Sequence, residues 1–250
     1  MSDGWEWPTR SGALYFGPPG HAASEGAPAG EAPGPVPASE APRPAPGGEP
    51  SGAGAPGRPA VFLDRDGVLI EGVPDPDSGL LESALRVEDV RLLPGVAGSM
   101  RSLAAAGYAL VCASNQPAAA KGKVTLERIE AIHERVVELL AGQGARLDAS
   151  YLCPHHPEGV VAELSGRCEC RKPAPGMLLE GARRLGLALD AAWMVGDTDA
   201  DVEAGRAAGC RTALLVYHGT AHKRSGGANA DVLEPDLPAA ATRLADHRRG

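Results

Sequence analysis

The chain has 250 residues, of which 43% are apolar, and a formal net charge of −8. This length allows one domain of ordinary size with additional segments, and the negative charge argues against a general nucleic-acid-binding protein. The N-terminus lacks a basic region followed by an apolar stretch, and no apolar run reaches the ~18 residues of a membrane-spanning helix, so we expect neither a signal peptide nor a membrane partner.

Residues 1–58 differ in composition from the rest of the chain, because proline, glycine and alanine dominate them. Such a segment buries too little apolar surface to offset its loss of conformational entropy on folding. We therefore expect a disordered N-terminal tail in residues 1–58 and one folded domain in residues 59–250. Two further readings stay open: the prolines could bind an aromatic groove, and the aromatic residues at the start could form a docking patch (Trp5, Trp7, Tyr15 and Phe16).

From residue 60 onward, short apolar runs alternate with amphipathic stretches. Strands are predicted over residues 60–63, 108–113, 149–152, 193–195, 212–217 and 231–233. Helices are predicted over residues 94–106, from the cap residue Thr125 through residue 140, and over residues 175–185 and 199–208. Alternation of this kind is typical of an α/β fold with a three-layer, doubly wound parallel sheet.

Polar residues follow several of these strands. Asp64 and Asp66 come directly after the strand over residues 60–63, and Asp197 follows the strand over residues 193–195. Because parallel strands end at one edge of the sheet, where open α/β sheets bind ligands, these side chains are expected in one crevice with Ser114 and Lys172. Asp201 joins them from the following helix.

Crowded carboxylates beside lysine and serine suit phosphoryl transfer, in which cations offset the charge of the phosphate oxygens. Carboxylates that face a phosphate dianion require a cation, and Mg²⁺ is the natural choice for oxygen ligands. In this interpretation Lys172 adds positive charge and Ser114 donates a hydroxyl hydrogen bond.

A second metal site is predicted from cysteine and histidine spacing. Three of the five cysteines, Cys153, Cys168 and Cys170, lie near the pair His155-His156. Three thiolates and one imidazole suit tetrahedral Zn²⁺ with no open position, which indicates a structural site. A thiolate cluster of this kind fits a reducing cytoplasm better than a disulfide framework.

These motifs, in this order, resemble the haloacid dehalogenase superfamily of phosphatases. The resemblance implies that Asp64 is the nucleophile that forms an aspartyl-phosphate, and that Asp66 protonates the leaving oxygen and later activates water. It implies that Asp197, Asp64 and the Asp66 backbone carbonyl hold Mg²⁺. It also implies substrate contacts, which the chain would make through Arg65, Asn115, Gln116 and Arg171.

The strings FLDRDGVL, CPHHPEG, CECRKPAPGMLL and MVGD resemble one branch of that superfamily, the D-glycero-D-manno-heptose 1,7-bisphosphate 7-phosphatases. The resemblance implies little or no cap domain, a loop stapled by zinc with His155 as the histidine ligand, and a phosphorylated sugar as the small-molecule partner. We expect the protein to be a monomer. Histidinol-phosphate phosphatases share this zinc loop and provide an alternative substrate. A catalytically idle binding protein on the same scaffold and phosphoryl transfer to another acceptor are further alternatives.

The chain also departs from this branch. Pro117, Ala118 and Lys121 stand where the branch usually has Ser-Gly and later an arginine, and residues 72–89 differ as well. Proline removes a backbone donor, and lysine cannot contact phosphate in the bidentate way of arginine. These positions are therefore expected to affect the choice of substrate.

Overall fold

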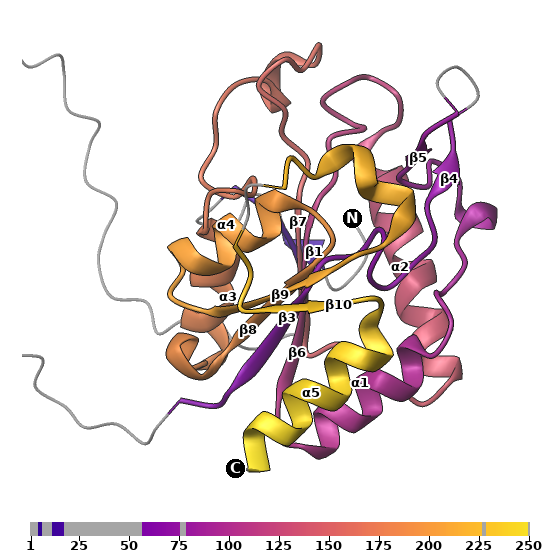
Figure 1. Cartoon of the computed structure of the whole chain (residues 1–250). Coiled ribbons are helices and arrows are strands. Elements are labelled where there is room, and N and C mark those ends of the chain that lie inside the picture. The colour runs from indigo at the N-terminus through magenta and orange to yellow at the C-terminus, as the bar shows by residue number, and fades with distance from the viewer. Residues whose placement is uncertain (1–4, 7–11, 18–56, 76–78, 227–228, 250) are drawn as a thin grey trace, which may run out of the picture.

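A computed structural model describes residues 5–6, 12–17, 57–75, 79–226 and 229–249 (Figure 1). Its centre is an eight-stranded sheet with the order β1-β2-β7-β6-β3-β8-β9-β10. From β7 to β10 every neighbouring pair is parallel, which confirms the predicted parallel sheet. These strands are β3 (Ala60–Leu63), β6 (Ala109–Asn115), β7 (Ala149–Cys153), β8 (Trp193–Gly196), β9 (Arg211–Leu215) and β10 (Val232–Glu234).

Helices cover both faces of this sheet and make the three layers of the fold (Figure 1). One apolar cluster joins the sheet to α1 (Val96–Ala105), α2 (Leu126–Gly142) and α5 (Leu237–Arg249). On the other face lie α3 (Gly176–Leu185), which packs on β6 and β7, and α4 (Asp199–Ala207), which packs on β8 and β9. Among the residues that the structure describes, no helix combines the length and apolar character needed to span a bilayer.

The central strand β3 shows how the sequence builds two cores. Its side chains alternate between the two faces, as a strand requires. Val61 and Leu63 belong to the cluster on the α1 side, while Ala60 and Phe62 belong to the cluster on the α3 side. All four residues are fully buried, so β3 is fixed on both faces and holds the backbone that follows it.

Local signals set the ends of two predicted helices. The side chain of Thr125 accepts a hydrogen bond from the Arg128 backbone N–H at 3.3 Å, so it caps α2 as predicted. Helix α3 ends at Gly186, which has φ +63°, a left-handed conformation that glycine adopts without strain. The segment between β3 and α1 contains only the hairpin β4 (Val73–Pro74) and β5 (Leu81–Glu82) and the short helix η1 (Val87–Asp89) among its described residues. That agrees with the expectation of little or no cap.

The N-terminal residues differ from the expectation of a tail without structure. Trp5–Glu6 forms β1 and Leu14–Phe16 forms β2, and β2 pairs with β7 in the antiparallel direction. Leu14 is fully buried. The physical reason is that β7 would otherwise present an unpaired sheet edge, which a distant segment of any composition can fill through backbone hydrogen bonds. The remainder of the predicted tail lies outside the described residues, apart from Gly57 and Arg58.

Candidate functional site

The carboxyl ends of β3, β6 and β8 form the floor of a cavity of about 340 Å³. Asp64 and Asp66 follow β3, Asn115 ends β6, and Asp197 follows β8. Lys172 reaches the same floor from the segment before α3. The residues that line the cavity are Asp64, Asp66, Glu82, Ser83, Asn115, Pro117, Lys121, Arg171, Lys172, Asp197, Thr198, Ala200, Thr220 and Lys223.

Lys172 is the central cation of this floor. Its Nζ lies 3.1 Å from Asp64 Oδ1 and 2.5 Å from Asp201 Oδ1, and it donates to the Ala113 carbonyl at 2.7 Å. Although burial lowers the pKa of Lys172, the carboxylates of Asp201 and Asp64 outweigh burial and raise that pKa. The ammonium group is therefore charged at neutral pH and fixed between two acids.

Asp201 has both carboxylate oxygens occupied. Besides the contact of Oδ1 with Lys172, Asp201 Oδ2 accepts hydrogen bonds from the Thr198 backbone N–H at 3.0 Å and from the Thr198 hydroxyl at 2.6 Å. Thr198 is the N-cap of α4, so this pair also fixes the first turn of the helix. Asp201 thus holds Lys172 and has little capacity left for another ligand.

Asp197 is in the opposite situation. It is buried, and neither of its carboxylate oxygens has a hydrogen-bond partner among the described residues. Burial, followed by the charges of Asp64 and Asp201, raises the pKa of Asp197 well above its usual range and outweighs the opposing effects of the nearby Thr220 side chain and of Lys172. Burial also raises the pKa of Asp64 to about 6, against the opposing effect of Lys172. Ligand oxygens of Asp64, Asp197 and Asp201 lie within 4.8 Å of one another.

The three carboxylates of this cluster carry more negative charge than Lys172 can offset, and their oxygens suit a hard divalent cation. A buried carboxylate without a donor is costly unless a cation or a proton accompanies it. Asp197 has that requirement, whereas Asp201 is satisfied by Lys172 and Thr198, and Asp64 shares the single charge of Lys172 with Asp201. The donor set is therefore suited to Mg²⁺ held by Asp64 and Asp197.

Glycine permits the close approach of these acids. Gly67 has φ +80°, and a Cβ at this residue would overlap the Asp197 carboxylate. A Cβ at Gly196 would overlap the carboxyl group of Asp201. Any larger residue at either position would push an acid out of the floor, which explains why glycine follows Asp66 and precedes Asp197.

The Asp66 carboxylate is held by two buried side chains. Arg65 Nη2 lies 3.1 Å from Asp66 Oδ2, and Gln116 Nε2 donates to the same oxygen at 2.7 Å. Gln116 also donates to the Ser114 hydroxyl at 3.0 Å and accepts from Arg65 at 2.5 Å. The Ser114 side chain also lies close enough to Asp64 to lower the pKa of that acid.

The substrate contacts of Arg65 and Gln116 stay predictions, and the structure places both side chains outside the cavity lining. Both were expected to contact substrate, but Arg65 is 0% exposed and Gln116 2% exposed, and neither lines the cavity. Both side chains are engaged with neighbouring polar groups, since Arg65 bonds to Asp66 and Gln116 also bonds to Ser114. Both side chains contact Asp66, and neither reaches the cavity.

The other two expected substrate contacts do line the cavity. Asn115 exchanges two hydrogen bonds with the backbone of Lys172, at 2.9 and 3.0 Å. Arg171 donates to the His155 carbonyl at 3.1 Å. Lys121, one of the residues that departs from the resembling branch, lines the same side of the cavity and is exposed.

The cavity lining also contains residues that the sequence did not single out. Lys223, from η4 (His218–Lys223), pairs with Glu82 of β5 at 3.0 Å, and Thr220 lies beside them. No motif marks Lys223, because its position depends on how the segment after β9 folds over the site. The sequence does contain a signal for Thr198, because it stands three residues before Asp201, which is the spacing of a capping box.

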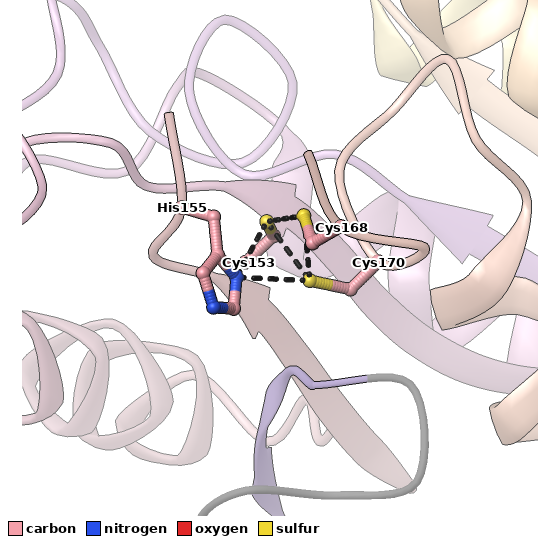
Figure 2. A group of neighbouring side chains, drawn as sticks. All are labelled: Cys153, His155, Cys168 and Cys170. Atoms are coloured by element: carbon pink, nitrogen blue, oxygen red, sulfur yellow. Dashed lines mark hydrogen bonds between the residues drawn. The ribbon is translucent and has the colours of Figure 1, made fainter. Parts of the chain in front are cut away.

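A second cluster lies in residues 153–170, which we call the metal loop. Figure 2 shows the side chains of Cys153, His155, Cys168 and Cys170 converging on one point. The Cys153 Sγ lies 3.6 Å from Cys168 Sγ and 3.0 Å from Cys170 Sγ, and the remaining thiol pair is 3.4 Å apart. His155 Nδ1 lies 3.7 and 3.4 Å from the sulfurs of Cys153 and Cys170.

These separations are close to those of a four-coordinate metal site. Tetrahedral Zn²⁺ with ordinary bond lengths places its sulfur ligands about 3.8 Å apart and sulfur and nitrogen about 3.5 Å apart, and only the Cys153–Cys170 pair, at 3.0 Å, is much closer than that. Cys153 and Cys170 are fully buried, and burial raises the pKa of the Cys153 thiol. A thiolate at that depth needs a cation beside it. The histidine in this set is His155; the side chain of His156 accepts from the Glu158 backbone N–H and is absent from the cluster.

Comparisons with known proteins agree with this geometry. A family model described as HAD-hydrolase-like matches residues 169–243. The D-glycero-beta-D-manno-heptose-1,7-bisphosphate 7-phosphatase of Yersinia pestis is 41% identical over 185 residues, which cover 73% of this chain and 94% of that protein. The D-glycero-D-manno-heptose-1,7-bisphosphate 7-phosphatase of Thermosynechococcus vestitus is 42% identical over 183 residues, or 72% of this chain and 89% of the relative.

Solved structures of two phosphatases are similar to this chain as well. The D,D-heptose 1,7-bisphosphate phosphatase from B. bronchiseptica, complexed with magnesium and phosphate, superposes with a TM-score of 0.64 at 30% identity. The match covers 76% of this chain and 99% of that one. A HAD-like phosphatase from Mesorhizobium loti superposes with a TM-score of 0.62, also at 30% identity, over 77% of this chain and 87% of that one.

Proposed function

Because the chain belongs to the family of the heptose-1,7-bisphosphate 7-phosphatases within the HAD-like hydrolases, we propose that it hydrolyses the 7-phosphate ester of D-glycero-D-manno-heptose 1,7-bisphosphate. Membership confirms the resemblance drawn from the sequence and makes the chain a phosphoric monoester hydrolase. The observation that carries the proposal is the floor of the cavity, where Lys172 joins Asp64 to Asp201 while Asp197 lacks a partner among the described residues.

The reaction follows from the placement of two acids. A carboxylate oxygen of Asp64 attacks phosphorus, and the bond from phosphorus to the sugar oxygen breaks while Asp66 gives that oxygen a proton. Asp66 then takes a proton from water, whose oxygen attacks the aspartyl-phosphate. Breaking the bond between phosphorus and Asp64 releases inorganic phosphate and restores the nucleophile.

The remaining residues hold this pair in place. Lys172 keeps Asp64 ionised and offers positive charge to the phosphate oxygens. Gln116 and Arg65 fix the carboxylate of Asp66 from below. Mg²⁺ bound by Asp64, Asp197 and the Asp66 carbonyl would neutralise the charge that develops on the phosphoryl group.

A bisphosphate fits the charges at the rim of the cavity. Lys121, Arg171 and Lys223 all line the cavity in addition to Lys172. These cations can offset a second phosphate while the first lies on Asp64. Lys121 in place of arginine would weaken that contact without abolishing it, since it keeps the charge but loses the bidentate geometry.

The substrate is tested by comparing kcat/KM for heptose 1,7-bisphosphate, heptose 7-phosphate and histidinol phosphate with Mg²⁺ present. The proposal expects the bisphosphate to be the preferred substrate, and the Lys121→Ala variant to lose that preference over the monophosphate. Preference for histidinol phosphate would refute the sugar assignment. No turnover of any phosphate ester would favour an idle binding protein on this scaffold.

Zinc is proposed for the metal loop, where it would fix the backbone that leads from Cys170 to Lys172. A reducing compartment such as the cytoplasm would keep the three thiols free for the metal.

Both edges of the sheet are short, two residues in β1 and three in β10, which disfavours edge-to-edge pairing of two copies. We therefore keep the expectation of a monomer, which the mass of the protein in solution would test.

A further inference from the structure

Residues 12–17 lie against the metal loop, far along the chain from the segment they touch. A Cβ placed on Gly12 would be 3.5 Å from His155 Cε1 and 4.0 Å from Cys170 Sγ, so the Gly12 backbone rests on two of the four ligands. Gly12 has φ +82°, which favours glycine. Ala13 is fully buried in the same apolar cluster as Cys153 and Cys170.

The contact continues along β2. Leu14 pairs with Leu152, the residue before the ligand Cys153, and Tyr15 pairs with Tyr151. Successive side chains of β2 enter opposite cores, with Leu14 on the α1 side and Tyr15 on the α3 side. The strand that carries the first metal ligand is thereby paired by β2 and packed on both faces.

Tyr15 also joins this segment to α3. Its ring lies 5.2 Å from the ring of Tyr151, and the guanidinium carbon of Arg184 stands 4.6 Å above it. Arg184 is itself held by Glu180 at 2.7 Å. Residues 12–17 are thus fixed by backbone pairing, by two buried side chains and by a cation over an aromatic ring.

We propose that residues 12–17 are a cover that retains the metal of the metal loop. A chelator must reach the ion through the loop, and this segment closes the side formed by His155 and Cys170. Opening that side requires β2 to leave β7, which exposes Leu14 and Tyr15 to water. Contacts around a metal ligand commonly change metal affinity by about 10-fold to 100-fold. The inference does not depend on which phosphate ester the enzyme hydrolyses.

The test uses the full-length protein loaded with zinc and measures the rate at which a chromophoric chelator removes the metal. Leu14→Asp places a carboxylate where β2 is fully buried, and we expect release to become about 10-fold to 100-fold faster. Leu233→Asp makes the same exchange on β10, where the side chain is 62% exposed, and should release zinc at the wild-type rate. Leu244→Ala, in the buried face of α5, controls for a general loss of stability and should also keep the wild-type rate.

Tyr15→Ala provides a milder second variant, which decides the question if Leu14→Asp does not fold. It removes the ring contacts with Tyr151 and Arg184 but keeps the backbone pairing, so a smaller acceleration is expected. Zinc release at the wild-type rate from Tyr15→Ala, or from both β2 variants, would overturn the proposal. An acceleration in Leu244→Ala as large as in the β2 variants would overturn it too, since global unfolding would then explain the release.

Discussion

Replacing Asp197 by asparagine should stabilise the metal-free protein and remove its response to Mg²⁺. Ligand oxygens of Asp197 and Asp64 lie within 4.8 Å of each other. Two full charges at that distance repel by about 3 kcal/mol at an effective dielectric constant of about 20, and the raised pKa of Asp197 makes this an upper limit, because a bound proton relieves part of the repulsion. Lys172 offsets part of this, so we expect Asp197→Asn to raise the unfolding free energy by about 1–3 kcal/mol, or Tm by about 2–4 °C per kcal/mol.

The assay is thermal unfolding at neutral pH, once with a chelator and once with Mg²⁺. The wild-type protein should gain Tm when Mg²⁺ is added, because the ion compensates a carboxylate that lacks a hydrogen-bond partner among the described residues. D197N should start higher and gain little, and its phosphatase activity should be lost. If D197N is destabilised equally with chelator and with Mg²⁺, the repulsion inferred from the structure is wrong.

Three further perturbations test the neighbouring residues. Lys172→Met leaves the acids of the ion pairs at 3.1 and 2.5 Å unmatched, so it should cost about 3–5 kcal/mol of unfolding free energy; a neutral effect in denaturant titration would contradict the pairing. Gln116→Leu frees the Asp66 carboxylate and should lower kcat by about 10-fold to 100-fold with KM unchanged, whereas a raised KM alone would point to substrate contact. The pKa of Asp64, about 6 in the folded protein against 3.8 unfolded, means that the folded state binds the extra proton. Metal-free stability should therefore fall by about 3 kcal/mol as pH rises from about 4 to about 6. The Tm gain with Mg²⁺ should accordingly be larger at neutral pH than at about pH 5, and equal gains would refute the link.

Much of the parallel sheet was predictable because its strands are short, apolar and bounded by clear turn residues. The strand over residues 60–63 was placed correctly to the residue, and the prediction for residues 231–233 differs from β10 by one residue at each end. Helix α5 was not predicted. Its buried face consists mainly of small residues, Ala240 and Ala241 beside Leu237 and Leu244, which give weak apolar contrast in the sequence. Strand β2 was missed because its order comes from pairing with β7, a contact that composition does not reveal.

Some residues of the candidate site were likewise predictable from the sequence, and others were not. Asp64, Lys172 and Asp197 were expected in one crevice because they follow or flank strand ends, and they do lie together; their catalytic roles stay proposals. The cysteine spacing correctly selected the three thiols that converge in the metal loop, and the family resemblance selected His155 over His156 as the fourth residue. Arg65 could not be placed from sequence, since a charged residue between two acids gives no sign that it is fully buried. The pair Lys223–Glu82 joins segments distant in the chain, and only the fold brings it to the cavity.

The central claim is that Asp64 attacks the 7-phosphate of a heptose bisphosphate in a Mg²⁺-dependent hydrolysis. Phosphorus NMR of heptose 1,7-bisphosphate incubated with Mg²⁺ and either wild-type protein or Asp64→Asn tests it most directly. We predict that the wild-type protein removes the 7-phosphate resonance, leaves the 1-phosphate resonance and produces inorganic phosphate, whereas Asp64→Asn leaves both esters intact. Release of phosphate by Asp64→Asn at the wild-type rate would contradict the account.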